Sequence, residues 1–299
     1  MMKTGNLKAT IIVNPNAGIE KTERYAQLLA KKIESYFDKV LILTTQKPKD
    51  AYNFAKEEAI DSHSIFVIGG DGTVNEVTSG IIEADSQAIL GIVPSGTYNA
   101  FSRMLKIPQN VEQWIEALDF NKITTVDTGK VNDRYFNYLL SIGDLAEAVH
   151  QVKVQEKQTF GPLPYYFNGL INLLNERKRH FRICANDVVT EVEASLILVS
   201  LSDFFGDFKL TSVDRHLRDG AANLLIIEDA GLISKLQLLP DLIGGNLNSS
   251  LEVNVRPIRK IRIECDEDLV ESDIDGDLGP YFPLEIEVLS QRMRVYHGF

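Results

Sequence analysis

Short apolar runs alternate with segments of helical periodicity through the N-terminal part of the chain, and this alternation restricts the fold more than any other feature. Each run is apolar almost throughout, which is typical of strands that are buried on both faces. Strands separated by helices predict a parallel sheet that is covered by helices on both sides. The strand-like runs are Ala9–Val13, Lys39–Leu43, Ser64–Ile68 and Ala88–Val93, and Asp50–Ala59 is among the helical segments.

The pattern changes near Thr125 to short alternating segments, which predict a mainly antiparallel β-rich region. A length of 299 residues also favours two domains. We therefore expect an α/β domain at residues 1–125 and a β-rich domain at residues 126–299, whose last strand either closes the second domain or returns to the first. One helix is expected from Tyr165 to Glu176. The expected strands are Asp127–Val131, Tyr135–Ile142, Glu193–Ser200, Leu224–Ile227, Leu284–Val288 and Met293–Tyr296.

Charge and cysteine content restrict the partners and the compartment. The chain has 31 Lys and Arg against 42 Asp and Glu, a net charge of −11, which argues against nucleic acid as a partner. Contact with an anionic membrane would need a local basic or apolar patch. Cys184 and Cys265 are too few for a disulfide framework, and no run approaches the ~20 apolar residues of a membrane span. We expect a cytoplasmic protein that touches a membrane surface only transiently, if its substrate is a lipid.

A glycine-rich turn, Gly69–Thr73, follows a predicted buried strand and opens a predicted helix. Glycines let the backbone approach a ligand closely, and the N–H groups at the start of a helix favour an anion. The turn therefore predicts a phosphate site, in which Asp71 would give a carboxylate oxygen to a magnesium ion on the phosphates. Taken alone, a tight turn with an aspartate cap is an equally good interpretation.

Two further polar turns, Asn14–Gly18 and Pro94–Phe101, follow other predicted strands. Because the carboxyl ends of parallel strands lie at one edge of a sheet, we expect all three loops to meet there. The loops match neither the Walker A motif, which needs Gly-Lys-Ser/Thr, nor the spacing of the dinucleotide-binding fingerprint. The predicted phosphate site is therefore of another kind.

Together with Asp219-Gly220 and the stretch Asp275–Pro280, these motifs make the chain resemble the diacylglycerol kinase-like lipid kinases of bacteria, which are related to sphingosine kinases and more distantly to NAD kinases and phosphofructokinases. The resemblance covers nearly the whole chain. It implies that residues 1–125 form the nucleotide-binding catalytic domain, of NAD kinase and phosphofructokinase type, and that residues 126–299 form the β-rich lipid kinase domain. The active site would lie in the cleft between them.

The resemblance also implies roles for particular residues. A structural magnesium ion would be bound by Asp219 and by the backbone carbonyls of His216 and Ala221. The turn that contains Asp275 and Asp277 would supply the acid that takes the proton from the lipid hydroxyl. The residues that would hold ATP are Asn14, Pro15, Asn16, Ala17, Gly18, Thr45, Gly70, Asp71, Gly72, Thr73, Val74, Asn75, Glu76 and Thr97.

The chemistry of phosphate transfer agrees with these roles. An alcohol is a poor nucleophile at neutral pH, so a carboxylate must accept its proton as phosphorus is attacked. Asp275 and Asp277 flank a glycine, a spacing that lets both carboxylates point into one cleft. Asp71 would be the third catalytic residue, because it would help to neutralise the charge of the phosphates through the magnesium ion. Without the resemblance, a solvated acidic hairpin turn is the better interpretation of Asp275–Asp277.

We therefore expect an ATP-dependent kinase that uses Mg²⁺ and phosphorylates the hydroxyl of a membrane lipid, first of all a diacylglycerol-like alcohol, in phospholipid metabolism. Two alternatives stay open: a catalytically degenerate nucleotide- or lipid-binding regulator, and a soluble-substrate kinase of the NAD kinase type. The first is motivated by four departures from the family's usual residues, at Ala100, Leu145, Asn223 and Asp277. The sequence predicts neither the particular lipid nor the oligomeric state, for which a homodimer is one option.

Overall fold

The computed structural model describes residues 7–18, 21–143, 178–185, 188–205, 208–209, 217–228, 253–267, 270 and 272–298. The chain divides into two compact units, Met1–Val126 with Gln291–Phe299, and Asp127–Ser290. The predicted helix Tyr165–Glu176 lies outside the described residues. No helix within the described ranges is long and apolar enough to cross a membrane.

The first unit is built on a parallel sheet, as predicted. Its strands stand in the order β4-β3-β1-β2, and each neighbouring pair is parallel. The end of the long strand β17 adds to the other side of β4, where Arg294 lies opposite Ile89. The strands are β1 (Lys8–Val13), β2 (Lys39–Thr44), β3 (Ser64–Gly69), β4 (Ile89–Pro94) and β17 (Leu284–Tyr296).

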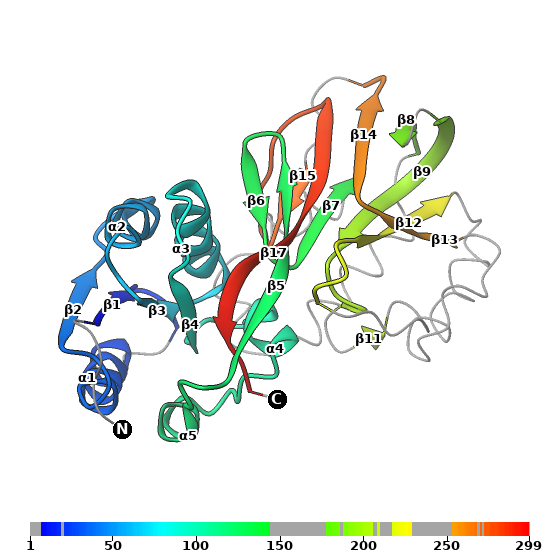
Figure 1. Ribbon diagram of the computed structural model, residues 1–299. Coiled ribbons are helices and arrows are strands. Elements are labelled where there is room, and N and C mark those ends of the chain that lie inside the picture. Colours follow the sequence, from blue (N-terminus) through cyan, green and yellow to red (C-terminus); the bar gives the residue numbers. More distant parts are fainter. Residues whose placement is uncertain are drawn as a thin grey trace. The chain divides into compact units, whose positions relative to one another are not determined.

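Helices cover both faces of this sheet (Figure 1). One face carries α1 and α5, which contact each other, and the opposite face carries α2 and α3. Strands β3 and β4 are buried along their whole length because both of their faces are covered, whereas the edge strand β2 leaves Ile42 exposed. The helices are α1 (Thr22–Ile33), α2 (Asp50–Glu58), α3 (Asp71–Glu83), α4 (Ala100–Met104) and α5 (Val111–Ala117).

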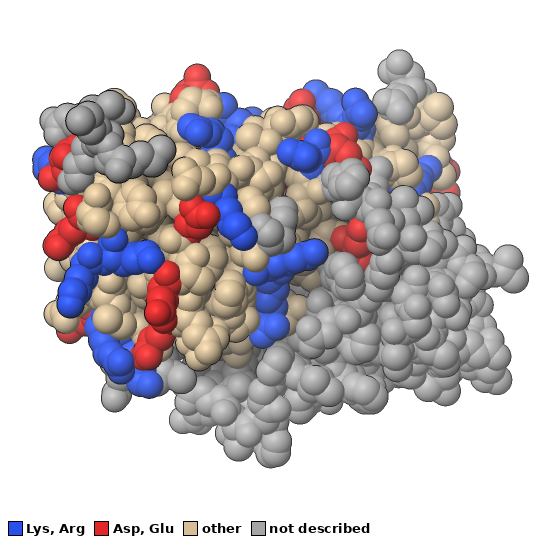
Figure 2. Space-filling view, turned by 60° about the horizontal axis from the view of Figure 1, so that its bottom comes forward, with Lys and Arg blue, Asp and Glu red and all other residues tan. Residues whose placement is uncertain are grey.

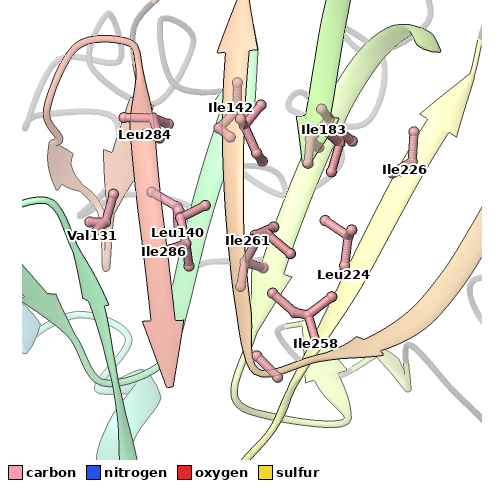
Figure 3. Packing of buried hydrophobic residues seen from close by; sticks show 14 of the residues in the cluster. Val131, Leu140, Ile142, Ile183, Leu224, Ile226, Ile258, Ile261, Leu284 and Ile286 are labelled. Carbon is pink, nitrogen blue, oxygen red and sulfur yellow. The ribbon is translucent and has the colours of Figure 1, made fainter. Parts of the chain in front are cut away.

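The second unit is a mainly antiparallel β structure, which confirms the expected fold class. Its core is formed by aliphatic side chains that meet across neighbouring strands, among them Leu140, Ile183, Leu224 and Ile261 (Figure 3). The strands are the second part of β5 (Ile123–Val131), β6 (Arg134–Phe136), β7 (Leu139–Gly143), β8 (Arg179–Ala185), β9 (Val188–Ser200), β10 (Phe204–Phe205), β11 (Phe208–Lys209), β12 (Ala222–Glu228), β13 (Val253–Ile258), β14 (Lys260–Cys265), β15 (Ser272–Ile274), β16 (Asp277–Leu278) and the first part of β17.

Two boundaries differ from the prediction. The expected strand Tyr135–Ile142 is divided into β6 and β7, because the backbone N–H groups of Asn137 and Tyr138 donate to the side chain of Asp275. The two strands expected at the C-terminal end are one continuous strand, β17, which contains Gln291 at a positive φ of 51°. The strand therefore continues through residues 289–292, which the prediction left between the two strands.

Candidate active site

The predicted phosphate turn lies where β3 ends and α3 begins. Gly70 is the N-cap of α3, and it has no side chain to cap the first N–H groups of the helix. These groups carry the positive end of the helix dipole, which favours a bound anion. No side chain of the N-cap residue covers the start of α3, and phosphate binding there stays a prediction.

Glycines bring the neighbouring loops into backbone contact at this point. A Cβ atom on Gly96 would lie 2.5 Å from Cα of Gly70, and one on Gly18 would lie 2.0 Å from the carbonyl oxygen of Ser95. Gly18 also has a φ of +72°, a conformation that favours glycine. The loops after β1, β3 and β4 therefore touch because these positions carry no side chain.

Hydrogen bonds join the same loops. The N–H of Asn14 donates to the carbonyl of Ile68 over 2.9 Å, and the N–H of Ser95 donates to the carbonyl of Gly69 over 3.0 Å. The side-chain amide of Asn14 donates to the hydroxyl of Thr73 over 2.8 Å. The structure thus brings the three predicted loops together at the carboxyl edge of the parallel sheet.

The remaining residues of the predicted nucleotide set lie around this edge in different ways. Thr45 follows β2 there, with its N–H on the carbonyl of Val13, whereas Thr97 is exposed in the loop after β4. Val74 is buried, so only its backbone could meet a ligand. Pro15 and Asn16 are exposed, and Ala17, Gly72 and Asn75 are partly buried.

Asp71 is held by the loop after β4. Its Oδ2 accepts a hydrogen bond of 2.9 Å from the N–H of Asn99. Asn99 has left-handed backbone angles, a conformation that asparagine tolerates better than most residues, and its own Oδ1 accepts from the N–H of Gly96 over 2.8 Å. The amide of Asn99 also donates to Gln109, whose Nε2 donates to the hydroxyl of Ser102. Gln109 could not be recognised from the sequence, because this contact depends on the folded loop.

Glu76 has a visible role in the fold. Its carboxylate accepts from the N–H of Lys49 over 3.0 Å and from the N–H of Tyr52 over 3.4 Å, at the start of α2. It therefore caps α2 from α3 and satisfies N–H groups that a helix start leaves without helical partners. Its participation in nucleotide binding stays a prediction.

In the second unit, the acidic turn is a two-residue hairpin loop. Asp275 and Gly276 connect β15 to β16, in which Ile274 lies opposite Asp277. Their φ values are 54° and 98°, which are typical of the type I′ turn that an Asp-Gly pair favours. The hairpin shape of the turn is thus explained by its sequence.

The carboxylate of Asp275 is bound by the backbone. Its Oδ2 accepts from Asn137 N–H over 2.8 Å, and its Oδ1 accepts from the N–H groups of Tyr138 and Leu139, each over 3.0 Å. Both oxygens are therefore engaged by the segment between β6 and β7. Asp277, by contrast, is exposed on β16, which has only β15 beside it in the described sheet.

A third acid, Asp273, lies beneath this turn, and sequence reasoning missed it. Only 4% of its surface is exposed, and its Oδ1 accepts a hydrogen bond of 2.9 Å from the N–H of Gly276. Burial raises the pKa of Asp273 to about 7, and the negative charges of Asp275 and Asp277 act in the same direction. No local pattern could have found it, because all three residues of β15 are buried and alternation along the strand does not single out position 273.

The predicted structural metal site can be followed only in part. Asp219 is exposed, and its Oδ1 accepts a hydrogen bond from the N–H of Ala221. The N–H of Gly220, between these two residues, donates to the buried carboxylate of Asp127 over 2.7 Å. His216 lies outside the described residues. The described part of the chain holds no group of three or more His, Cys, Asp or Glu side chains that could bind a metal by themselves. Asp219 offers a carboxylate oxygen, which is the kind of ligand that magnesium prefers, and the metal site stays a prediction.

The fold of the two units and comparison with known proteins together show a class of two-unit kinase-type proteins. Residues 8–131 match the family model of the diacylglycerol kinase catalytic domain. Residues 141–297 match that of the YegS C-terminal NAD kinase beta sandwich-like domain. The chain belongs to this family of diacylglycerol kinase-like lipid kinases.

Individual relatives extend over nearly the full length. The chain is 40% identical to a protein of Streptococcus pneumoniae that is named as a candidate lipid kinase, over 97% of each chain. It is 30% identical to the diacylglycerol kinase of Staphylococcus saprophyticus, over 97% of this chain and 95% of that one. A crystal structure of a candidate diacylglycerol kinase from Bacillus anthracis matches with a TM-score of 0.85 at 28% identity, over 99% of this chain and 97% of the other.

Proposed function

We propose that this protein transfers the terminal phosphate of ATP to the hydroxyl of a membrane lipid, with a diacylglycerol-like alcohol as the first candidate. The observation that carries the proposal is the meeting of the Asn14, Gly70 and Gly96 loops at the start of α3. These are the loops that the family resemblance assigns to the nucleotide. The proposal places the phosphate donor on the first unit and assigns the acceptor chemistry to the second.

The residues of the first unit would bind and orient the phosphates. The N–H groups of the first turn of α3 would donate to phosphate oxygens, and the absence of a side chain at Gly70 would let the phosphates approach the backbone. Magnesium, when bound, would neutralise charge on the phosphates, and Asp71 is suited to hold it with a carboxylate oxygen. The hydrogen bond from Asn99 orients that carboxylate.

The second unit would supply the proton acceptor, and the geometry favours Asp277 over Asp275. Both oxygens of Asp275 already accept backbone N–H groups, which stabilises its charge and weakens it as a base. Asp277 is exposed and within reach of a substrate hydroxyl from solvent. We therefore assign the proton transfer to Asp277 and the positioning of the turn to Asp275.

A lipid acceptor is favoured by apolar side chains beside Asp277. Leu278 is 44% exposed and Tyr281 is 53% exposed. Their loop is fixed, because Arg134 donates to the carbonyl of Leu278 and the hydroxyl of Ser272 donates to the carbonyl of Pro280. An apolar surface next to the base suits a hydroxyl that is attached to acyl chains better than the polar ribose of a soluble dinucleotide.

Membrane contact would depend on such local features. Basic and acidic side chains are intermixed over the visible face of the described residues (Figure 2). With a net charge of −11, the molecule as a whole is repelled by an anionic membrane at long range. Exposed apolar residues near the acceptor site would provide a short-range attraction instead.

The test is an assay with labelled ATP and Mg²⁺, in which diacylglycerol, a sphingoid base and a polyprenol are offered in mixed micelles and NAD is offered in solution. Transfer of label to a lipid is the expected result. Label on NAD alone would support the soluble-substrate alternative. Binding of ATP without transfer to any acceptor would support a degenerate regulator and overturn the proposal.

A further inference from the structure

Asp273 occupies the centre of the short strand β15, between β7 and β16. It lies opposite Ser141 of β7 on one side and opposite Leu278 of β16 on the other. Its side chain is buried, and Oδ1 receives the N–H of Gly276 over 2.9 Å. The residue therefore contacts the turn that immediately precedes the exposed Asp277.

An ionised carboxylate at position 273 costs free energy, because the side chain is buried. Burial disfavours the ionised form of an acid, and an asparagine could accept the same hydrogen bond without that cost. The described neighbours make the cost greater, since β7 consists of uncharged residues and the nearest acids, Asp275 and Asp277, repel a further negative charge. The positive charge of Arg134 acts in the opposite direction and lowers the pKa of Asp273. The protein therefore keeps a carboxylate at position 273 in spite of the cost of burying it.

We propose that Asp273 is a positioning residue for the proton acceptor Asp277, and that its ionised form holds the turn in the active arrangement through the Gly276 N–H. The inference rests on the proposed function, because it concerns the base of that reaction. Asp275 fixes the same turn from the other side through the N–H groups of residues 137–139. The turn has two residues, so a shift of Gly276 is passed directly to Asp277.

Ionisation changes the strength of this contact. A hydrogen bond to a carboxylate is roughly twice as strong as one to a neutral acceptor, so protonation weakens the hold on Gly276. It also removes a negative charge from the neighbourhood of Asp275, Asp277 and Arg134. Because burial raises the pKa of Asp273 to about 7, both forms are populated near neutral pH. Small changes in pH would then alter how well Asp277 is held.

The main test compares wild type with Asp273→Asn, which keeps an acceptor oxygen for Gly276 and cannot ionise. For wild type we expect kcat with the best lipid acceptor to rise ~10-fold between about pH 6 and about pH 8, as expected for one group that titrates near the middle of that range. The KM for ATP should not change over this range. In Asp273→Asn the rise in kcat should disappear, while Asp133→Asn, an exposed acid in the loop between β5 and β6, should keep the wild-type profile. A rise that persists in Asp273→Asn would overturn the proposal.

A second measurement does not depend on catalysis. The backbone amide of Gly276 should shift in two-dimensional NMR spectra with a midpoint near pH 7 in wild type and stay constant in Asp273→Asn. A Gly276 amide that does not titrate in wild type would refute the assignment. If the amide titrates but wild type phosphorylates no lipid, the contact stands and the proposed function fails, so the two failures can be told apart.

Discussion

The N–H of Asn99 donates a hydrogen bond of 2.9 Å to Oδ2 of Asp71, and this contact joins the loop after β4 to the first turn of α3. The carboxylate of Asp71 is therefore oriented by a backbone N–H group. Because Asn99 sits at the N-cap of α4 in a left-handed conformation, the position of Asp71 depends on the backbone of a neighbouring loop. Orientation of this kind is what a group that acts on phosphate charge requires.

Replacing Asp71 by Asn should lower turnover by at least ~10²-fold without unfolding the protein, since it removes a charge but keeps an acceptor for Asn99. Turnover and the unfolding transition are measured together. Asp85→Asn is the matched control, because it makes the same charge change beyond the other end of α3 and should leave turnover within about 2-fold. Near-normal turnover of Asp71→Asn would mean that its role is misassigned.

The contact between Gly70 and Gly96 predicts a graded effect on nucleotide binding. A Cβ at position 96 would lie 2.5 Å from Cα of Gly70, whereas a Cβ at position 70 would lie 3.2 Å from Cα of Gly96. Gly96→Ala should therefore raise the KM for ATP more than Gly70→Ala, by ~10-fold or more against a few-fold. A larger KM for Gly70→Ala than for Gly96→Ala, or no change in either variant, would contradict phosphate binding at these loops.

The two acids of the hairpin should respond differently to substitution. Asp277→Asn should lower kcat by ~10²-fold or more with unchanged stability, because the residue is exposed. Asp275→Asn should also lower the free energy of unfolding by about 2 kcal/mol or more, since the amide group cannot accept all three backbone N–H groups. Urea unfolding and single-turnover kinetics on both variants measure the difference. Equal stability of the two variants would contradict the assignment.

The stability of the protein should depend on pH through Asp273. Its pKa lies at about 7 in the folded protein, against an ordinary value of 3.8. Between these values the folded protein keeps a proton that the unfolded chain has released, so the free energy of unfolding falls as pH rises through this window. The fall amounts to roughly 4 kcal/mol and is complete above the folded pKa.

Asp273→Asn removes this contribution. The difference in unfolding free energy between wild type and variant should therefore change from about pH 4 to about pH 7 and then stay level. Urea titrations at several pH values measure it. Parallel stability curves for the two proteins would show that Asp273 ionises normally.

The exposed side chains of Leu278 and Tyr281 predict an effect on the KM for the lipid acceptor but not on the KM for ATP. Replacing Leu278 and Tyr281 by Ser should raise the KM for the lipid by ~10-fold and leave the KM for ATP unchanged, because the lost apolar contact area belongs to the lipid. Ile60→Ser is the control, since Ile60 is 79% exposed in the first unit. An equal effect of all the substitutions would indicate general membrane affinity rather than contact near the base.

Much of the first unit could be predicted because its signals are local. A buried strand, a glycine turn and a helix follow one another along the chain, and the parallel arrangement then brings Asn14, Gly70 and Gly96 together. The glycines were recognisable because their role is a backbone conformation or a close approach. The cap that Glu76 forms on α2 and the hydrogen bond from the N–H of Asn99 to Asp71 were not, since each depends on a partner in another element.

In the acidic turn, too, the local conformation could be predicted from the sequence and the long-range contacts could not. Asp-Gly between two short strands predicts a hairpin, and the structure has one. The interaction of Asp275 with residues 137–139 crosses more than a hundred positions of sequence, and it also divides the strand expected at Tyr135–Ile142. Neither this contact nor the burial of Asp273 leaves a trace in the local pattern.

The end of strand β17 belongs to the first unit but is synthesised after the second unit. Its last residues complete the parallel sheet beside β4, where Tyr296 stacks on Phe66 at 5.6 Å and its hydroxyl meets that of Ser64. These residues leave the ribosome only after the entire second unit. Until then β4 stands as an open edge, which is prone to pair with other chains. The parallel sheet of the first unit therefore stays incomplete until Arg294 and Val295 have been synthesised.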